Sequence, residues 1–94
     1  MKEKYRMSDI ITLVTAAGEM VGRISSEDET SITLENPRAF VQTRDGVGFA
    51  PGVCLTGIKD PKEVSYNKLA VIMMCETNEE VQKIWLQATT GLVV

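Results

Sequence analysis

The sequence predicts a small, mostly β domain with one helix near its C-terminal end. Short runs rich in β-branched residues alternate with turn residues across positions 10–75, which is typical of antiparallel strands. A glycine interrupts one of these runs at Gly22, which favours a sharp bend. After Glu76 the apolar residues recur with a helical period. At 94 residues, 44% apolar and 24% charged, the chain fits a single domain over residues 1–94.

The first three strands follow from β-branched runs separated by turns. Residues 10–17 predict the first strand, and Gly18 predicts the tight turn that ends it. Residues 20–26 predict the second strand, with Gly22 in its interior. Because an interior glycine weakens a strand, we expect a bend or a close backbone approach there. Residues 32–35 alternate apolar and polar side chains and predict the third strand.

The middle of the chain carries turn signals and one long apolar run. Pro37 interrupts the third strand and predicts a bulge or a break. Asp45-Gly46 predicts a two-residue hairpin turn of type I′. Beyond this hairpin, the sequence leaves residues 36–60 open between an extended hairpin and a loop. Residues 64–75 are expected to hold the best-buried strand of the protein, because they are almost continuously apolar.

The C-terminal part predicts a helix over about 78–89. A capping box at Thr77 and Glu80 is expected to start it, and Gly91 is expected to end it. We expect Trp85 to anchor the helix in the core or at an interface, and residues 92–94 are a candidate last strand. The apolar face of the helix is predicted to comprise Val81, Ile84, Trp85 and Ala88.

The two cysteines and the apolar runs bear on the compartment. Cys54 and Cys75 both have apolar neighbours and are interpreted as buried, reduced thiols, with a disulfide as the less favoured alternative. No signal peptide is recognisable, and the longest apolar run is too short to span a membrane. We therefore expect a cytoplasmic protein without a membrane partner.

Several kinds of chemistry lack their residues in this sequence. There is no histidine, no phosphate-binding glycine motif, and two cysteines alone do not make a zinc site. The acidic run at 27–29 is interpreted as a solvated turn rather than a cation site. We therefore expect no enzymatic activity, no cofactor and no metal, with acid–base chemistry by carboxylates as the open alternative. The net charge of −3 argues against sequence-blind binding of duplex DNA.

Residues 10–35 resemble the first motif of the Sm and Sm-like (LSm) proteins, which include the bacterial Hfq relatives. Gly18 corresponds to the turn glycine of that motif and Gly22 to the glycine of its bent second strand. Asp28 corresponds to the aspartate that follows six residues later. Ile32 and Leu34 correspond to the core of the third strand.

The resemblance implies a strongly bent, five-stranded antiparallel sheet that forms a small Sm-like (SH3-like) barrel. It further implies a homo-oligomeric ring of five to seven subunits that binds single-stranded RNA near its central pore. The RNA-binding candidates that it implies are Asp28, Thr30 and Ser31, with Asn78 near the place of the family's second motif. Asn78 is also well placed to cap the predicted helix, and we favour that role.

Two functions remain open, and we favour the binding of single-stranded RNA over the alternative of a structural module. The resemblance favours a ring that binds single-stranded RNA, with sparse basic residues repeated around it. The acidic composition favours a ring that serves as a structural assembly module without nucleic acid. The lack of an aromatic residue in the 28–31 loop points the same way, because base stacking needs such a platform.

Overall fold

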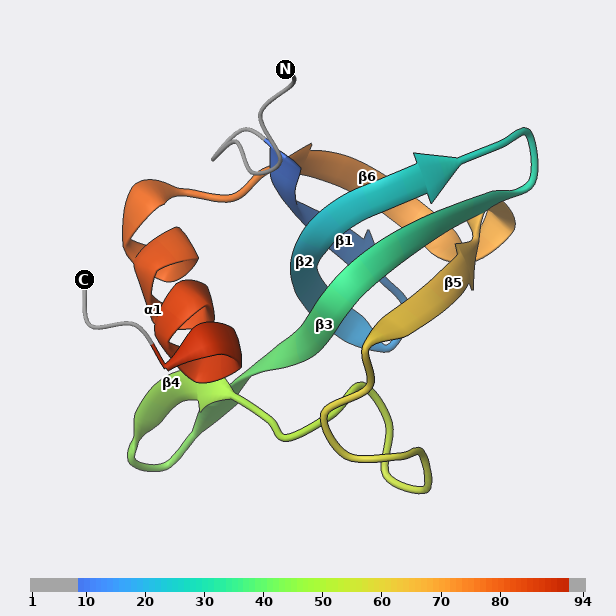
Figure 1. Cartoon of the computed structure of the whole chain (residues 1–94). Helices are drawn as coiled ribbons and strands as arrows, with labels where there is room; N and C mark the ends of the chain where they lie inside the picture. Colours follow the sequence, from blue (N-terminus) through green and yellow to red (C-terminus); the bar gives the residue numbers. More distant parts are fainter. Residues whose placement is uncertain (1–8, 92–94) are drawn as a thin grey trace, which may run out of the picture.

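The computed structural model describes residues 9–91, which form one curled antiparallel sheet and one helix (Figure 1). The predicted mostly β class with a single helix near the C-terminal end is confirmed; the candidate strand at 92–94 lies outside the described residues. The elements in chain order are β1 (Ile10–Thr15), β2 (Gly18–Glu27), β3 (Ser31–Thr43), β4 (Gly46–Phe49), β5 (Glu63–Asn67), the 3-10 turn η2 (Lys68–Ala70), β6 (Val71–Glu76) and α1 (Glu79–Thr90).

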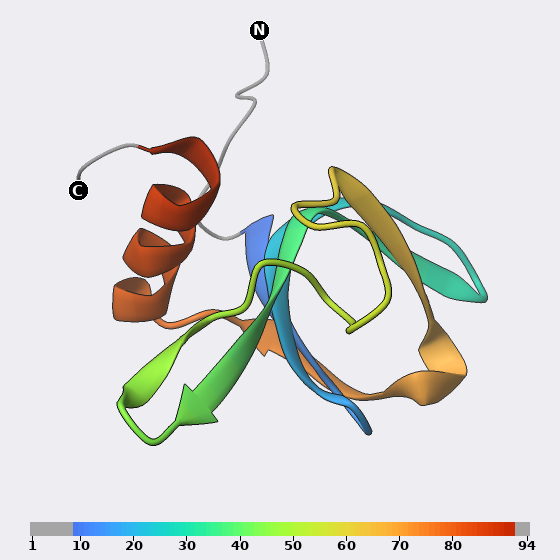
Figure 2. The ribbon, with the colours of Figure 1, turned by 90° about the horizontal axis from the view of Figure 1, so that it is seen from below.

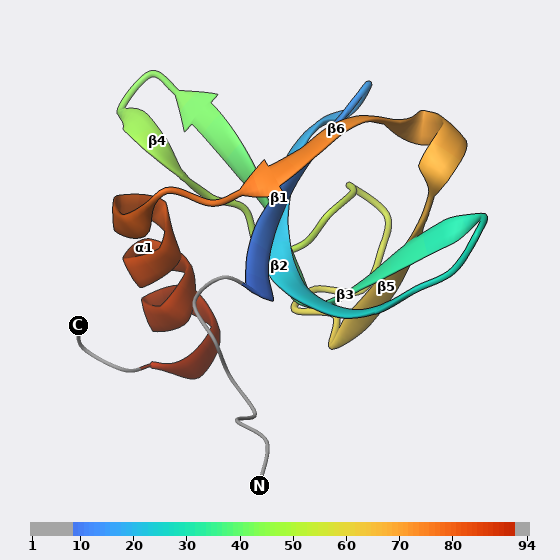
Figure 3. The ribbon, with the colours of Figure 1, turned by 90° about the horizontal axis from the view of Figure 1, so that it is seen from above.

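The sheet has six strands in the order β4-β3-β2-β1-β6, with β5 also paired to β3. The prediction of five strands is wrong because β3 is 13 residues long and serves two partners along one edge. Its first part pairs with β5 and its last part with β4. Figure 3 shows the sheet curling until β5 and β6 are joined by η2. Within the described chain these two strands do not pair, so the sheet stays open.

The β1–β2 and β3–β4 hairpins use the same turn. In each, a threonine hydroxyl accepts a hydrogen bond from the amide two residues later and donates one to the glycine carbonyl three residues later. The threonines are Thr15 and Thr43, and the glycines, Gly18 and Gly46, both have φ of 125°. The predicted type I′ turn is wrong: Thr43 pairs with Gly46, so this glycine follows the two central residues instead of being one of them.

The sheet bends where β2 and β3 approach each other at Gly22. The pairing shifts there, so that Gly22 faces two residues of β3, Asn36 and Pro37. A Cβ atom on Gly22 would lie 3.0 Å from the carbonyl oxygen of Glu35 and 3.2 Å from the Cα of Pro37. Asn36 takes a left-handed φ of 49° to form this bulge. The close approach at Gly22 and the bulge at Pro37 are both confirmed.

The two faces of the sheet each bury a core. The inner, concave face buries Ile11, Leu13, Met20, Ile32 and Leu34. The outer face buries Ile10 and Val21 against Trp85 of α1, with Phe40 and Phe49 of the β3–β4 hairpin beside them. Trp85 is fully buried, which confirms its role as an anchor. The helix therefore covers the outer face of the sheet, while the side chains of the curled inner face pack against one another.

The helix begins one residue later than predicted and presents a different face. Asn78 is its N-cap, with Oδ1 accepting from the amide of Val81 at 2.9 Å, as favoured for this residue. The predicted Thr77 cap is wrong, because the Thr77 hydroxyl instead bonds that of Thr12. Ile84 is exposed, and Gln82 is buried in its place beside Trp85. Gly91 ends the helix in a left-handed conformation, as expected.

The run at 64–75 differs most from its prediction. It is not one strand but two, β5 and β6, separated by η2. Its apolar residues are largely exposed. Ile72, Met73 and Met74 all lie on the surface of β6, because in the described part of the chain this strand has a neighbour on one side only. Cys75 on β6 and Cys54 are likewise exposed free thiols, so the prediction that both are buried is wrong.

Substitution of Gly22 by alanine tests the bend. We expect Gly22→Ala to lower the free energy of unfolding by about 1–3 kcal/mol, because the new methyl group meets backbone atoms that cannot move aside. Gly48→Ala is the matched control, since its methyl group would enter open space. Urea unfolding followed by Trp85 fluorescence measures both variants. Equal stability of the two variants would contradict a close approach at Gly22.

Candidate functional site

The β2–β3 turn is organised by the carboxylate of Asp28. Its Oδ1 accepts hydrogen bonds from the amides of Thr30 and Ser31, both at 2.8 Å, and from their hydroxyl groups at 3.3 and 3.2 Å. These donors, the Thr30 amide first, hold the pKa of Asp28 below its ordinary value. Three of the four residues implied by the resemblance therefore lie together, and Asp28 serves there to hold the turn.

A second turn lies beside the first and brings a lysine to it. The Lys68 amide in η2 donates to the carbonyl oxygen of Thr30 at 2.9 Å, and the Lys68 ammonium pairs with Glu27 at 2.9 Å. The Asn67 side chain caps η2 by accepting from the Leu69 amide. Lys68 is the site residue that the sequence analysis missed. Its signal was the polar pair Asn67-Lys68, which interrupts an otherwise apolar run.

Asn78 belongs to another part of the molecule. It caps α1, which packs on the outer face of the sheet, and it follows β6 where the Thr77 amide bonds the Ile10 carbonyl. Figure 1 shows α1 and the β2–β3 turn on opposite sides of the ribbon. The structure thus does not bring Asn78 to the other three candidates.

The β2–β3 turn at residues 28–31 and the adjacent turn η2, here called the paired turns, offer polar groups but no aromatic surface on which a base could stack. Every aromatic residue in the described part of the chain packs in one of the two cores. Tyr66 of β5 is the nearest in sequence to η2, and its ring packs on the inner core. Burial raises the pKa of Tyr66 to about 12, and its hydroxyl has no hydrogen-bond partner among the residues that the structure describes. The site can therefore bind by hydrogen bonds and by the charge of Lys68, which already faces Glu27.

The ends of the curled sheet form a second candidate surface. β6 pairs with β1 on one edge, β5 pairs with β3 on one edge, and neither has a partner on its other edge among residues 9–91. Four large apolar side chains project from η2 and β6. Their exposed fractions are 95% for Leu69, 71% for Ile72, 52% for Met73 and 45% for Met74. Exposed apolar side chains on both faces of a strand with an open edge are typical of a contact surface.

Comparisons with known proteins do not identify a family. No family model matches the chain, and no curated protein sequence matches it. In the described residues, no helix is long and apolar enough to cross a membrane. The same residues contain no group of three or more histidine, cysteine or acidic side chains placed to hold a metal ion.

Substitutions of Asp28 test its role in the turn. Asp28→Ala removes the carboxylate acceptors and should lower the urea midpoint of unfolding at pH 7. Asp28→Asn keeps one acceptor oxygen, so its urea midpoint should lie between those of the wild type and Asp28→Ala. The folded-state pKa is depressed, so the stabilisation is present above the unfolded pKa and is lost as pH falls through the folded pKa. The gap between wild type and Asp28→Ala should therefore narrow in acid. A gap that is constant with pH would contradict a role for the charge.

Proposed function

We propose that this chain is a subunit of a homo-oligomer that assembles through the edges of its curled sheet. The observation that carries the proposal is that β5 and β6 each have a free edge among residues 9–91, with exposed apolar side chains on β6. The short strand β4 also has a free edge, but it lies on the β3–β4 hairpin, away from these two strands. An open strand edge is a liability in water unless another chain covers it. Pairing β6 of one copy with β5 of the next uses both edges at once and supplies the missing backbone partners.

The side chains on the two edges are complementary in kind. Met74 pairs with Leu13 of the inner core, and so lies on the concave face. On β5, Val64 and Tyr66 face the same way, opposite Leu34 and Ile32. Edge pairing would therefore set Met74 beside the Val64 and Tyr66 of the next copy. Each added apolar contact contributes roughly 25 cal/mol per Å² removed from water.

A head-to-tail contact of this kind closes into a ring when the rotation between copies allows it. The resemblance to Sm-like proteins supports this form, with five to seven subunits and a barrel-like subunit. The strong bend at Gly22, opposite the bulge of β3, supports the barrel-like shape. The subunit interface would supply the pairing that β5 and β6 lack among residues 9–91 of one chain.

Interruption of the β6 edge tests the assembly. We expect light scattering to give a mass several times the 10.4 kDa of one chain for the wild type, and Ile72→Glu to reduce it to one chain by placing a charge at the contact. Ile84→Glu is the control, because Ile84 is also exposed but lies on α1. A wild-type protein that is a strict monomer would remove the proposal. So would an Ile84→Glu variant that dissociates equally.

A second candidate function is the binding of single-stranded RNA at the paired turns. The observation that favours it is the position of Lys68 beside the 28–31 turn, where exposed hydroxyls and one cation lie together. In a ring, each such group is repeated once per subunit, so several weak sites could contact one RNA strand together. The alternative is a ring without nucleic acid, which the acidic neighbours and the lack of a stacking aromatic favour.

Fluorescence anisotropy with short uridine-rich and adenine-rich RNAs separates these alternatives. If RNA binds, Lys68→Gln should weaken binding about tenfold and reduce its salt dependence. Lys83→Gln on α1 changes the net charge equally and should leave binding unchanged. No binding at low salt with micromolar protein would leave the assembly module as the function. The light-scattering result is independent of this outcome.

A further inference from the structure

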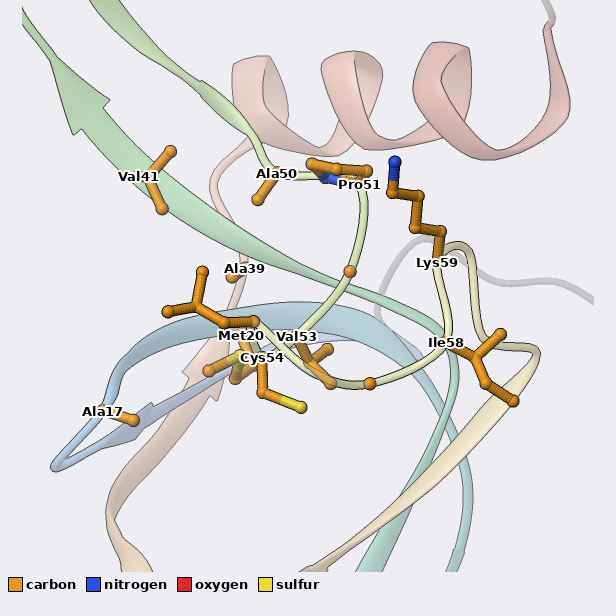
Figure 4. A pocket seen from close by; sticks show the side chains of 13 residues that line it. Ala17, Met20, Ala39, Val41, Ala50, Pro51, Val53, Cys54, Ile58 and Lys59 are labelled. Carbon is orange, nitrogen blue, oxygen red and sulfur yellow. The ribbon is translucent and has the colours of Figure 1, made fainter.

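An apolar cavity of about 520 Å³ lies beside the inner core and is separate from the paired turns. Met20 and Ala39 form its floor, Val53 and Cys54 come from the loop that follows β4, and Lys59 lies at its rim (Figure 4). Figure 1 shows this loop below the curled sheet, and Figure 2, the view from below, shows it in front of one open end of the curl. A volume of this size is typical of small-molecule sites, and the lining is predominantly apolar, as in such sites.

The loop is fixed to the exposed edge of β3, so the cavity is preformed. The Ala39 amide donates to the Gly52 carbonyl at 3.2 Å, and the Ala50 amide donates to the Ala39 carbonyl at 2.8 Å. The base of the loop is closed by the Asp60 amide, which donates to the Pro51 carbonyl at 2.7 Å. These bonds fix the walls of the cavity over a floor made of buried Met20 and half-buried Ala39.

A salt bridge also holds the base of the loop at Asp60. Arg38, which is buried, pairs with Asp60 at 3.2 Å, and its guanidinium also donates to the Pro37 carbonyl. The negative charge of Asp60, which adjoins Lys59 in the sequence, is thereby balanced by Arg38. Within residues 9–91 the Lys59 ammonium forms no salt bridge, and it is the one charged side chain that lines the cavity.

The residues that line the cavity indicate which class of ligand it can bind. An extended peptide would need free backbone partners, but the amide of Ala39 and the carbonyls of Pro51 and Gly52 are already bonded. What the cavity offers instead is apolar contact and one cation. A small molecule with an apolar body and a single anionic group satisfies both.

We propose that this cavity binds a small amphipathic anion, of the class of medium-chain carboxylates. The alkyl chain lies over Met20, Ala39 and Val53, and the carboxylate pairs with Lys59 at the rim. This site is independent of the sheet edges and of the paired turns, so it stands whether or not the chain assembles or binds RNA. For a ligand of about ten heavy atoms, a Kd on the order of 1 mM is expected.

Methionine-methyl NMR of the full chain with octanoate tests the proposal. The Met20 methyl resonance should shift and saturate as octanoate is added, whereas those of Met73 and Met74 on β6 should not move. Lys59→Met should weaken octanoate about tenfold. It should leave neutral 1-octanol unaffected, because only the anion uses the ammonium. Ala39→Leu, which fills the floor, should abolish binding of both ligands.

Lys62→Met is the matched control, since Lys62 lies outside this cavity and its loss changes the net charge equally. Equal effects of Lys59→Met and Lys62→Met on octanoate would overturn the proposal. The same holds for an unmoved Met20 resonance at 10 mM octanoate, roughly ten times the expected Kd. A Met20 shift that follows protein concentration without any ligand would assign the cavity to a second copy and also overturn it.

Discussion

The rest of the structure depends on the close approach between Gly22 of β2 and the bulge of β3. There the Trp85 indole donates to the Asn36 carbonyl at 3.0 Å, and the Asn36 amide donates to the Lys62 carbonyl at 2.8 Å. One residue thus joins α1, the bent sheet and the chain entering β5. The Arg23 guanidinium lies 5.2 Å from the centre of the Trp85 ring, which adds a cation–π contact to a buried anchor. Only a glycine at position 22 lets β3 come close enough for this arrangement.

The bend decides which surfaces the protein presents. Because β3 turns sharply at the bulge, β5 pairs with the part before it and β4 with the part after it. β5 therefore curls round toward β6, and η2 places Lys68 against the β2–β3 turn. The same bend leaves the stretch of β3 between its two partners to be covered by a loop, and this loop forms the apolar cavity. The open edges, the paired turns and the cavity are all consequences of one local geometry.

Features that depend on local residue patterns were predicted from the sequence, whereas features that depend on which strands pair were not. Gly22, the capping role of Asn78 and the anchor Trp85 follow from residue type and spacing, and the structure confirms them. The exposure of Ile72 does not follow, because an apolar run looks the same whether its strand is central or at an edge. The position of Lys68 beside Thr30 depends on strand order, which no local pattern encodes.

The charges around the paired turns favour assembly over RNA binding as the function. At the paired turns one cation, Lys68, faces the acidic run at 27–29 and is already bound to Glu27. A phosphate approaching this surface meets net negative charge, so binding cannot be driven by counterion release in the usual way. RNA would have to be held by hydrogen bonds from the turn hydroxyls to bases or sugars, without aromatic stacking. The apolar edge of β6 carries no such penalty, since its burial is favourable at any salt concentration. The proposed assembly therefore requires nothing beyond the surfaces that one copy presents, whereas RNA binding would require a ring to repeat a contact that is weak in one copy.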